Sequence, residues 1–122
     1  MPLRFDLVTF DTTSTDALAD FWKAALDLVE VEREDGDRWI VLASADGIRR
    51  LGFQRGEARG GSAHLDLRCA PDEFDAECAR LLALGATPAR PPRREPYGSI
   101  ANLVDPAGYL FDLCAYEPQG RV

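Results

Sequence analysis

The chain has 122 residues, a net charge of −7, and hydrophobic and charged fractions of 46% and 29%. This length suits one compact domain, and so acidic a chain would repel a phosphate backbone, so we expect no nucleic-acid partner. No apolar run is long enough to cross a bilayer, and the first residues lack the apolar stretch of a secretory signal. We therefore expect no membrane partner and a cytoplasmic protein.

The first half of the chain predicts a strand, a helix and three further strands. Residues 3–11 alternate between the two faces of a half-buried strand. Apolar side chains from Leu18 to Leu26 then recur at helical spacing, which predicts an amphipathic helix that ends near Leu28. Segments rich in β-branched and aromatic residues predict three more strands, at 29–34, 38–43 and 49–55.

The second half predicts a similar series. A strand at 64–69 precedes an apolar helical stripe from Phe74 to Leu82, which Gly85 would cap. Residues 87–89 predict a short strand, and the prolines that follow indicate a stiff, irregular, solvated loop that carries Arg90, Arg93 and Arg94. Two closing strands are predicted on either side of a D-P-A-G turn, at 100–104 and 109–116.

The two halves repeat one another along the chain. Leu7 precedes His64 by 57 residues, and Gln54 precedes Asp112 by 58. One helix for every four strands is too few for a doubly wound parallel sheet. The pattern instead predicts an α+β fold, in which two βαβββ modules (1–57 and 62–118) form a single domain (1–122) and their curved sheets share a cleft.

Polar residues interrupt two of the predicted strands. His64, Asp66 and Arg68 share one face of the 64–69 strand, and Asp112 lies on a face of the last strand. A buried imidazole needs a polar partner. His64 and Asp112 could hydrogen-bond to one another, line a wet pocket or hold an ion, whereas Asp66 and Arg68 are expected to form a salt bridge.

Four segments together resemble one superfamily. They are D-A-L-A-D-F-W-K-A-A-L, H-L-D-L, D-A-E-C-A-R-L-L-A-L-G-A and V-D-P-A-G-Y-L-F-D-L. With the repeat, they resemble the vicinal oxygen chelate superfamily, which includes glyoxalase I, extradiol dioxygenases, and fosfomycin and bleomycin resistance proteins. The resemblance spans residues 3–116 and implies the same two-module fold.

The resemblance also implies a metal site. Enzymes of this superfamily place four metal-facing residues on their opening and closing strands, and the matching positions here are Leu7, Gln54, His64 and Asp112. Leucine cannot bind a metal ion, and Gln54 offers only a neutral oxygen. The resemblance therefore implies one divalent ion (Ni, Zn, Mn or Fe) on His64, Asp112 and Gln54, or no ion at all.

Two functions remain open at this point. The first is a metal-dependent glyoxalase-like lyase or isomerase, with Asp112 as its catalytic base. The second is a metal-free homodimer that sequesters a small aromatic or cationic ligand, as bleomycin resistance proteins do. Either would bind a small molecule, and the residues predicted to line the ligand site are Leu7, Thr9, Trp39, Gln54 and Tyr97. A dimeric module with neither activity is a third possibility.

Overall fold

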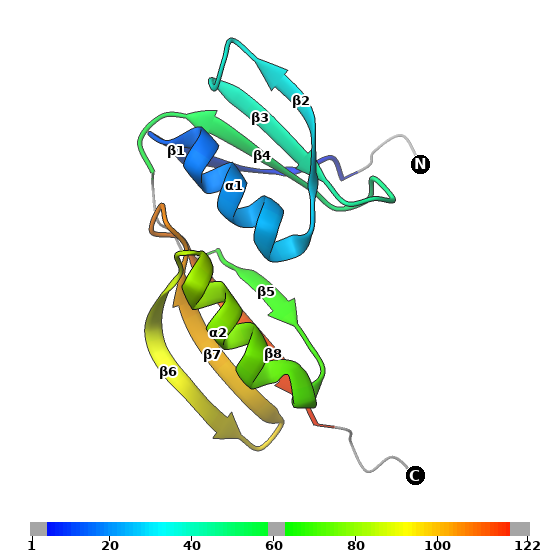
Figure 1. Ribbon diagram of the computed structural model, residues 1–122, viewed down its shortest axis with the longest axis vertical. Helices are drawn as coiled ribbons and strands as arrows, with labels where there is room; N and C mark the ends of the chain where they lie inside the picture. Colours follow the sequence, from blue (N-terminus) through cyan, green and yellow to red (C-terminus); the bar gives the residue numbers. More distant parts are fainter. Residues whose placement is uncertain (1–4, 59–62, 118–122) are drawn as a thin grey trace. The chain divides into compact units, whose positions relative to one another are not determined.

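The computed structural model describes residues 5–58 and 63–117, in two compact units that divide between Arg59 and Gly60 (Figure 1). Each unit has one α-helix and one four-stranded sheet, so the fold is α+β, as the sequence predicts. The predicted module ends at residues 1, 62 and 118 lie outside the described residues. Within the described ranges, no helix has the length and apolar character that crossing a bilayer requires.

The first unit contains a mixed sheet with one helix across it. Its elements, in chain order, are β1 (Val8–Thr12), α1 (Thr15–Leu26), β2 (Val29–Glu34), β3 (Trp39–Ala43) and β4 (Arg50–Arg55). The strand order is β1-β4-β3-β2, and only the β1–β4 pair is parallel. The helix ends at Leu26, earlier than predicted, because Asp27 adopts a left-handed conformation with φ 54° and closes the last turn.

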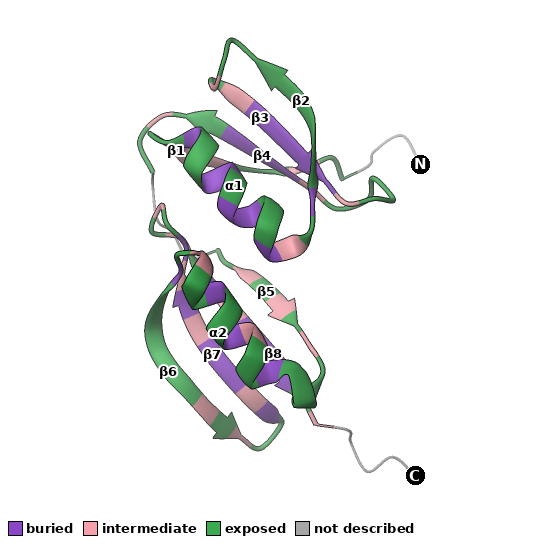
Figure 2. Ribbon diagram, in the orientation of Figure 1, coloured by how far each residue is buried: buried purple, intermediate pink, exposed green. Residues whose placement is uncertain are grey.

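The central strands β3 and β4 and the inner face of α1 form the core of the first unit. Phe53 and Ile40 are fully buried, and Leu18 and Trp22 of α1 are each 1% exposed. In Figure 2 the buried stretches of the helix and of β3 and β4 lie together. Burying one such side chain contributes about 1.5–3 kcal/mol. This packing fixes which residues of β3 and β4 point the other way.

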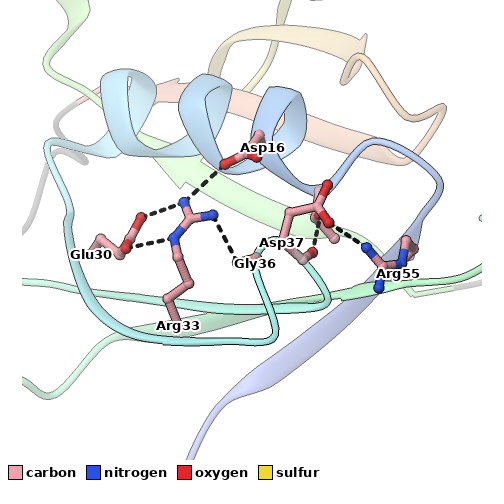
Figure 3. A network of polar contacts seen from close by, with 7 residues as sticks. Asp16, Glu30, Arg33, Gly36, Asp37 and Arg55 are labelled. Atoms are coloured by element: carbon pink, nitrogen blue, oxygen red, sulfur yellow. Dashed lines mark hydrogen bonds and ion pairs between the residues drawn. The ribbon is translucent and has the colours of Figure 1, made fainter.

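A polar network joins the β2–β3 turn to the start of α1 (Figure 3). The Arg33 guanidinium donates two hydrogen bonds to Glu30, at 2.9 and 2.8 Å, and one to Asp16, at 2.9 Å. It also donates to the carbonyl oxygen of Gly36. The bond from Arg33 lowers the pKa of the Glu30 carboxyl. The network orients the turn from which β3 begins.

The second unit repeats this arrangement. Its elements are β5 (Leu65–Arg68), a 3-10 turn (Pro71–Glu73), α2 (Phe74–Leu84), β6 (Thr87–Glu95), β7 (Gly98–Val104) and β8 (Leu110–Tyr116). The strand order is β5-β8-β7-β6, and only β5 and β8 are parallel. Phe111 and Leu113 of β8 are buried, as are Phe74 and Leu81 of α2. Gly85 ends α2 with φ 122°, as predicted.

The irregular loop predicted after residue 89 is wrong, because β6 continues to Glu95. β6 is the outermost strand of its sheet and pairs only with β7. A proline on an edge strand can turn its missing N–H position outward, where no partner strand needs it. The pairing of β6 with β7 also shifts its register between Pro88 and Arg93, where prolines interrupt the strand.

Candidate metal centre

His64, Asp66 and Asp112 lie together in the second unit. His64 directly precedes β5, and Asp66 lies opposite Asp112 in the parallel β5–β8 pair. Because side chains alternate along a strand, His64 and Asp66 project to one face, while Leu65 and Leu67 project to the other. One ligand-type atom from each of the three polar residues lies within 4.8 Å of the other two.

The spacing of these atoms fits a shared ion. His64 Nε2 lies 3.3 Å from Asp66 Oδ1 and 3.4 Å from Asp112 Oδ2. Both distances exceed the usual 2.7–3.2 Å of an N–H···O hydrogen bond. A metal ion about 2.0–2.2 Å from each ligand would hold neighbouring ligand atoms roughly 3.0–3.4 Å apart. The two spacings from His64 are therefore compatible with ligands of one divalent cation and are longer than a usual hydrogen bond.

The three side chains differ in their exposure. The Asp112 side chain is 19% exposed, that of His64 41% and that of Asp66 65%. Asp112 therefore lies at the base of the cluster and Asp66 at its rim. Two carboxylates this close repel one another, and a cation between them would relieve the repulsion. The charge and the donor atoms of the cluster are those of a candidate cation site.

Asp66 is a member of the cluster that the sequence analysis did not assign. Its signal was its place two residues after His64, on the same strand face. The predicted salt bridge between Asp66 and Arg68 is wrong. Asp66 lies beside His64, and the Arg68 guanidinium lies over the ring of Tyr116, 4.7 Å from its centroid.

Asn102 is a second residue that the sequence did not single out. It lies opposite Asp112 in the β7–β8 pair, and its Nδ2 donates a 2.6 Å hydrogen bond to Asp112 Oδ1. Its own Oδ1 is shielded from solvent and has no hydrogen-bond partner among the described residues. Leaving a buried acceptor unpaired costs about 1–3 kcal/mol. Only the register of the sheet reveals this contact.

In the first unit, three of the predicted ligand-binding residues share the sheet face opposite α1. Thr9 lies opposite Gly52 in the β1–β4 pair, and Trp39 lies opposite Gln54 in the β3–β4 pair. The Trp39 ring lies across Gly52, where an added Cβ would be only 2.6 Å from Cη2 of the ring. Its indole N–H donates to Glu32 Oε2 at 2.7 Å. We call this surface the tryptophan face.

The strand registers correct one correspondence drawn from the repeat. Thr9 precedes Asp66 by 57 residues, and the two residues are equivalent in their sheets. Thr9 faces Gly52, whereas Asp66 faces Asp112, so the counterpart of Asp112 is Gly52, at an offset of 112 − 52 = 60 residues. Gln54 lies two residues beyond that position. Its role as a metal ligand stays a prediction, without support from the repeat.

The two remaining predicted residues are Leu7, in the first unit, and Tyr97, in the second. Leu7 directly precedes β1 and is half-buried, and its side chain has no donor atom. Tyr97 lies in the β6–β7 turn, 38% exposed, with its ring centroid 6.0 Å from that of Tyr116. Tyr116 is four residues along β8 from Asp112, a separation of about 13 Å. Tyr97 is therefore not brought to the metal cluster.

The sequence model of the glyoxalase-like domain matches residues 7–114, which include elements of both units. The chain belongs to the glyoxalase-like domain family. This match and the solved structures of the same fold confirm the resemblance to the vicinal oxygen chelate superfamily. No curated protein matches this glyoxalase-like chain.

Several solved structures share the glyoxalase-like fold. The fosfomycin resistance protein FosX from Mesorhizobium loti is 21% identical, with a TM-score of 0.75 over 96% of this chain and 95% of its own. A mutant FosX from Listeria monocytogenes, complexed with Mn(II) and 1S,2S-dihydroxypropylphosphonic acid, is 17% identical, with a TM-score of 0.78 over 96% and 93%. A glyoxalase/bleomycin resistance protein/dioxygenase family enzyme from Burkholderia phytofirmans is 20% identical, with a TM-score of 0.78 over 92% and 98%. At these identities the likeness shows the fold alone.

Proposed function

We propose that this glyoxalase-like protein holds one divalent metal ion at His64, Asp66 and Asp112 and acts on a small molecule as a lyase or isomerase. The observation that carries the proposal is the spacing of 3.3 and 3.4 Å from His64 Nε2 to the two carboxylates. The FosX from Listeria monocytogenes, which has the same fold, is complexed with Mn(II). Mn(II) is therefore the first of the candidate ions to test.

The residues of the cluster have distinct roles in this proposal. His64 supplies a neutral nitrogen ligand, and the carboxylates supply negative charge. A bound ion would polarise paired oxygens of a substrate as a Lewis acid. Asp66, the most exposed of the three, lies at the rim, where a substrate would enter. Gln54 is retained as a further candidate ligand.

Asp112 is the proposed catalytic base. Its Oδ1 accepts the hydrogen bond from Asn102, so Oδ2 is the oxygen available to the ion or, in its place, to a substrate proton. A carboxylate oxygen within hydrogen-bond reach of the carbon beside a substrate carbonyl can remove its proton and return it to a neighbouring atom. Substitution Asp112→Asn would keep the shape of the side chain and remove this basicity.

Metal analysis tests the proposal directly. The protein is purified without added metal, loaded with Mn(II), desalted and analysed by inductively coupled plasma mass spectrometry. We expect about one ion per chain in the wild type. His64→Ala and Asp112→Ala should lose it, since each removes one of three protein ligands. Asp75→Asn, at an exposed position of α2, is the matched control and should retain the ion. Equal metal content in the wild type and His64→Ala would contradict the proposal.

A second candidate is a metal-free homodimer that sequesters a flat cationic ligand. The tryptophan face favours it, because the indole of Trp39 is held by Glu32 and is only partly buried. A cation over an indole face gains about 0.5–2 kcal/mol, and the net charge of −7 favours a cation. Leu7, Thr9, Gln54 and Tyr97 are the other proposed lining residues.

Fluorescence separates this candidate from the enzyme. Trp22 is 1% exposed, so quenching by an aromatic cation would report mainly on Trp39. We expect saturable quenching with thermal stabilisation in metal-free protein, both lost in Trp39→Leu. Light scattering after size exclusion would show whether the chain is a dimer. Unchanged fluorescence across a panel of aromatic cations, with stoichiometric metal, would exclude the binder.

A further inference from the structure

Asn102 is fixed in one orientation by its contact with Asp112. It projects from β7 directly opposite Asp112, and its Nδ2 lies 2.6 Å from Asp112 Oδ1. An ionised carboxylate only accepts hydrogen bonds, and of the two amide atoms only the nitrogen donates. The amide group therefore has to turn its nitrogen toward Asp112 and its oxygen away.

This contact separates the two oxygens of Asp112. Oδ1 is engaged by Asn102, whereas Oδ2 lies 3.4 Å from His64 Nε2. A carboxylate without the contact could rotate about its last bond and offer either oxygen. Asn102 therefore selects the oxygen that faces His64, as outer partners do for carboxylates that bind metal ions.

The oxygen of the Asn102 amide is unfavourably placed for stability. Asn102 Oδ1 is shielded from solvent and accepts no hydrogen bond from the described residues. A leucine of similar size would avoid this unpaired acceptor but would lose the hydrogen bond to Asp112, so that contact and not packing accounts for the asparagine. One end of the amide is thus engaged by Asp112 and the other is left unpaired, which points to the contact with Asp112 as the reason for the asparagine.

We propose that Asn102 is a positioning residue of the metal centre, which holds the Asp112 carboxylate in the rotation that binds the ion. This inference rests on the proposed function. It assigns to Asn102 no contact with the substrate. Its effect is exerted through Asp112, so it should change the affinity for metal without being needed for the fold.

The test measures Mn(II) affinity by calorimetry and the melting temperature of metal-free protein. We expect Asn102→Leu to bind Mn(II) 10–100-fold more weakly, the usual effect of losing an outer partner. Its metal-free melting temperature should stay close to that of the wild type, because removal of the unpaired acceptor offsets the lost hydrogen bond to Asp112. The electron paramagnetic resonance spectrum of its bound Mn(II) should also differ from that of the wild type.

Two controls separate the possible failures. Val104→Leu places a leucine on the same face of β7, away from Asp112, and should bind Mn(II) like the wild type. If Asn102→Leu and the smaller Asn102→Ala bind Mn(II) normally while His64→Ala does not, the role of Asn102 is refuted and the metal centre stands. A large fall in the melting temperature of both Asn102 variants would make the residue structural. A wild type that binds no Mn(II) would overturn the metal centre and this role together.

Discussion

Gly52 shows, at the scale of one residue, how a missing side chain shapes a surface. It occupies the position in the first sheet that Asp112 occupies in the second. The Trp39 ring lies where a side chain would otherwise project. One unit thus presents an aromatic ring at the position where the other presents a carboxylate.

Substitution Gly52→Ala should therefore disturb the tryptophan face. The new Cβ would lie 2.6 Å from Trp39 Cη2, so the ring has to move. We expect a loss of about 1–3 kcal/mol in the free energy of unfolding, as in other overpacked sites, and a shift in tryptophan emission. Urea unfolding and fluorescence measure both effects.

The matched control is Gly56→Ala, where the nearest atom would be 3.9 Å from the new Cβ and the contact is ordinary. The double variant Gly52→Ala with Trp39→Leu should recover stability relative to Gly52→Ala, because the clashing ring is absent. Equal stability of Gly52→Ala and Gly56→Ala would show that the ring does not depend on the glycine.

We predict that ionisation of Cys78 lowers the stability of the fold at alkaline pH. It is 7% exposed on α2, and burial raises the pKa of its thiol from the ordinary 9.0 to about 11. Between these values the unfolded chain ionises while the folded chain does not. The contribution of the neutral Cys78 thiol to the free energy of unfolding is therefore complete below pH 9. It is lost as the pH rises to 11, by about 2–3 kcal/mol.

Unfolding by urea at pH 7, 9, 10 and 11 measures this loss. Cys78→Val removes the titrating group and should flatten the decline between pH 9 and 11, with no change in slope between pH 6 and 8. An identical decline in both proteins would assign it to other groups, such as Cys69 or Tyr116, whose pKa values are also raised.

At the scale of elements, the turn before β8 depends on a buried aspartate. Asp105 is 3% exposed, and its Oδ1 accepts hydrogen bonds from the backbone N–H groups of Ala107 and Tyr109, at 2.9 and 3.0 Å. The corresponding turn before β4 has Asp46, which accepts from the N–H of Ile48 but is exposed. The aspartate that supports the turn is thus buried in the second unit and exposed to solvent in the first.

Asp105→Ala should cost about 1–3 kcal/mol in the free energy of unfolding, because two buried N–H groups lose their acceptor. Asp46→Ala should cost less, since water can replace the lost bonds. Chemical unfolding of both variants makes the comparison. A larger loss for Asp46→Ala would mean that burial does not decide the strength of these turns.

The helices and most strands could be predicted because each has a local pattern. The stripe of α2 and its glycine cap are set by neighbouring residues in the chain. The exception was β6, whose prolines indicated a loop. Whether a strand is at an edge depends on the order of the sheet, which a local pattern does not contain.

At the scale of the whole molecule, the three residues of the candidate metal cluster are all residues of the second unit. A ligand that binds the folded state stabilises it by about 2.7 kcal/mol at 100 times its dissociation constant. We expect Mn(II) to slow amide hydrogen exchange in β5 and β8, which carry Asp66 and Asp112. Mass spectrometry with and without Mn(II) measures this directly, with His64→Ala as the control. Protection confined to β1 and β4 would locate the ion elsewhere.

The sequence by itself determined the repeated βαβββ order and the apolar stripes of both helices, which follow from periodicity, and its resemblance to the superfamily singled out His64 and Asp112. Tertiary structure decided which residues face one another across neighbouring strands. It brought in Asp66 and Asn102, replaced Gln54 by Gly52 as the counterpart of Asp112, and placed the Trp39 ring across that glycine. Strand register depends on the turns and bulges between strands, and a shift of one residue exchanges the two faces of a sheet.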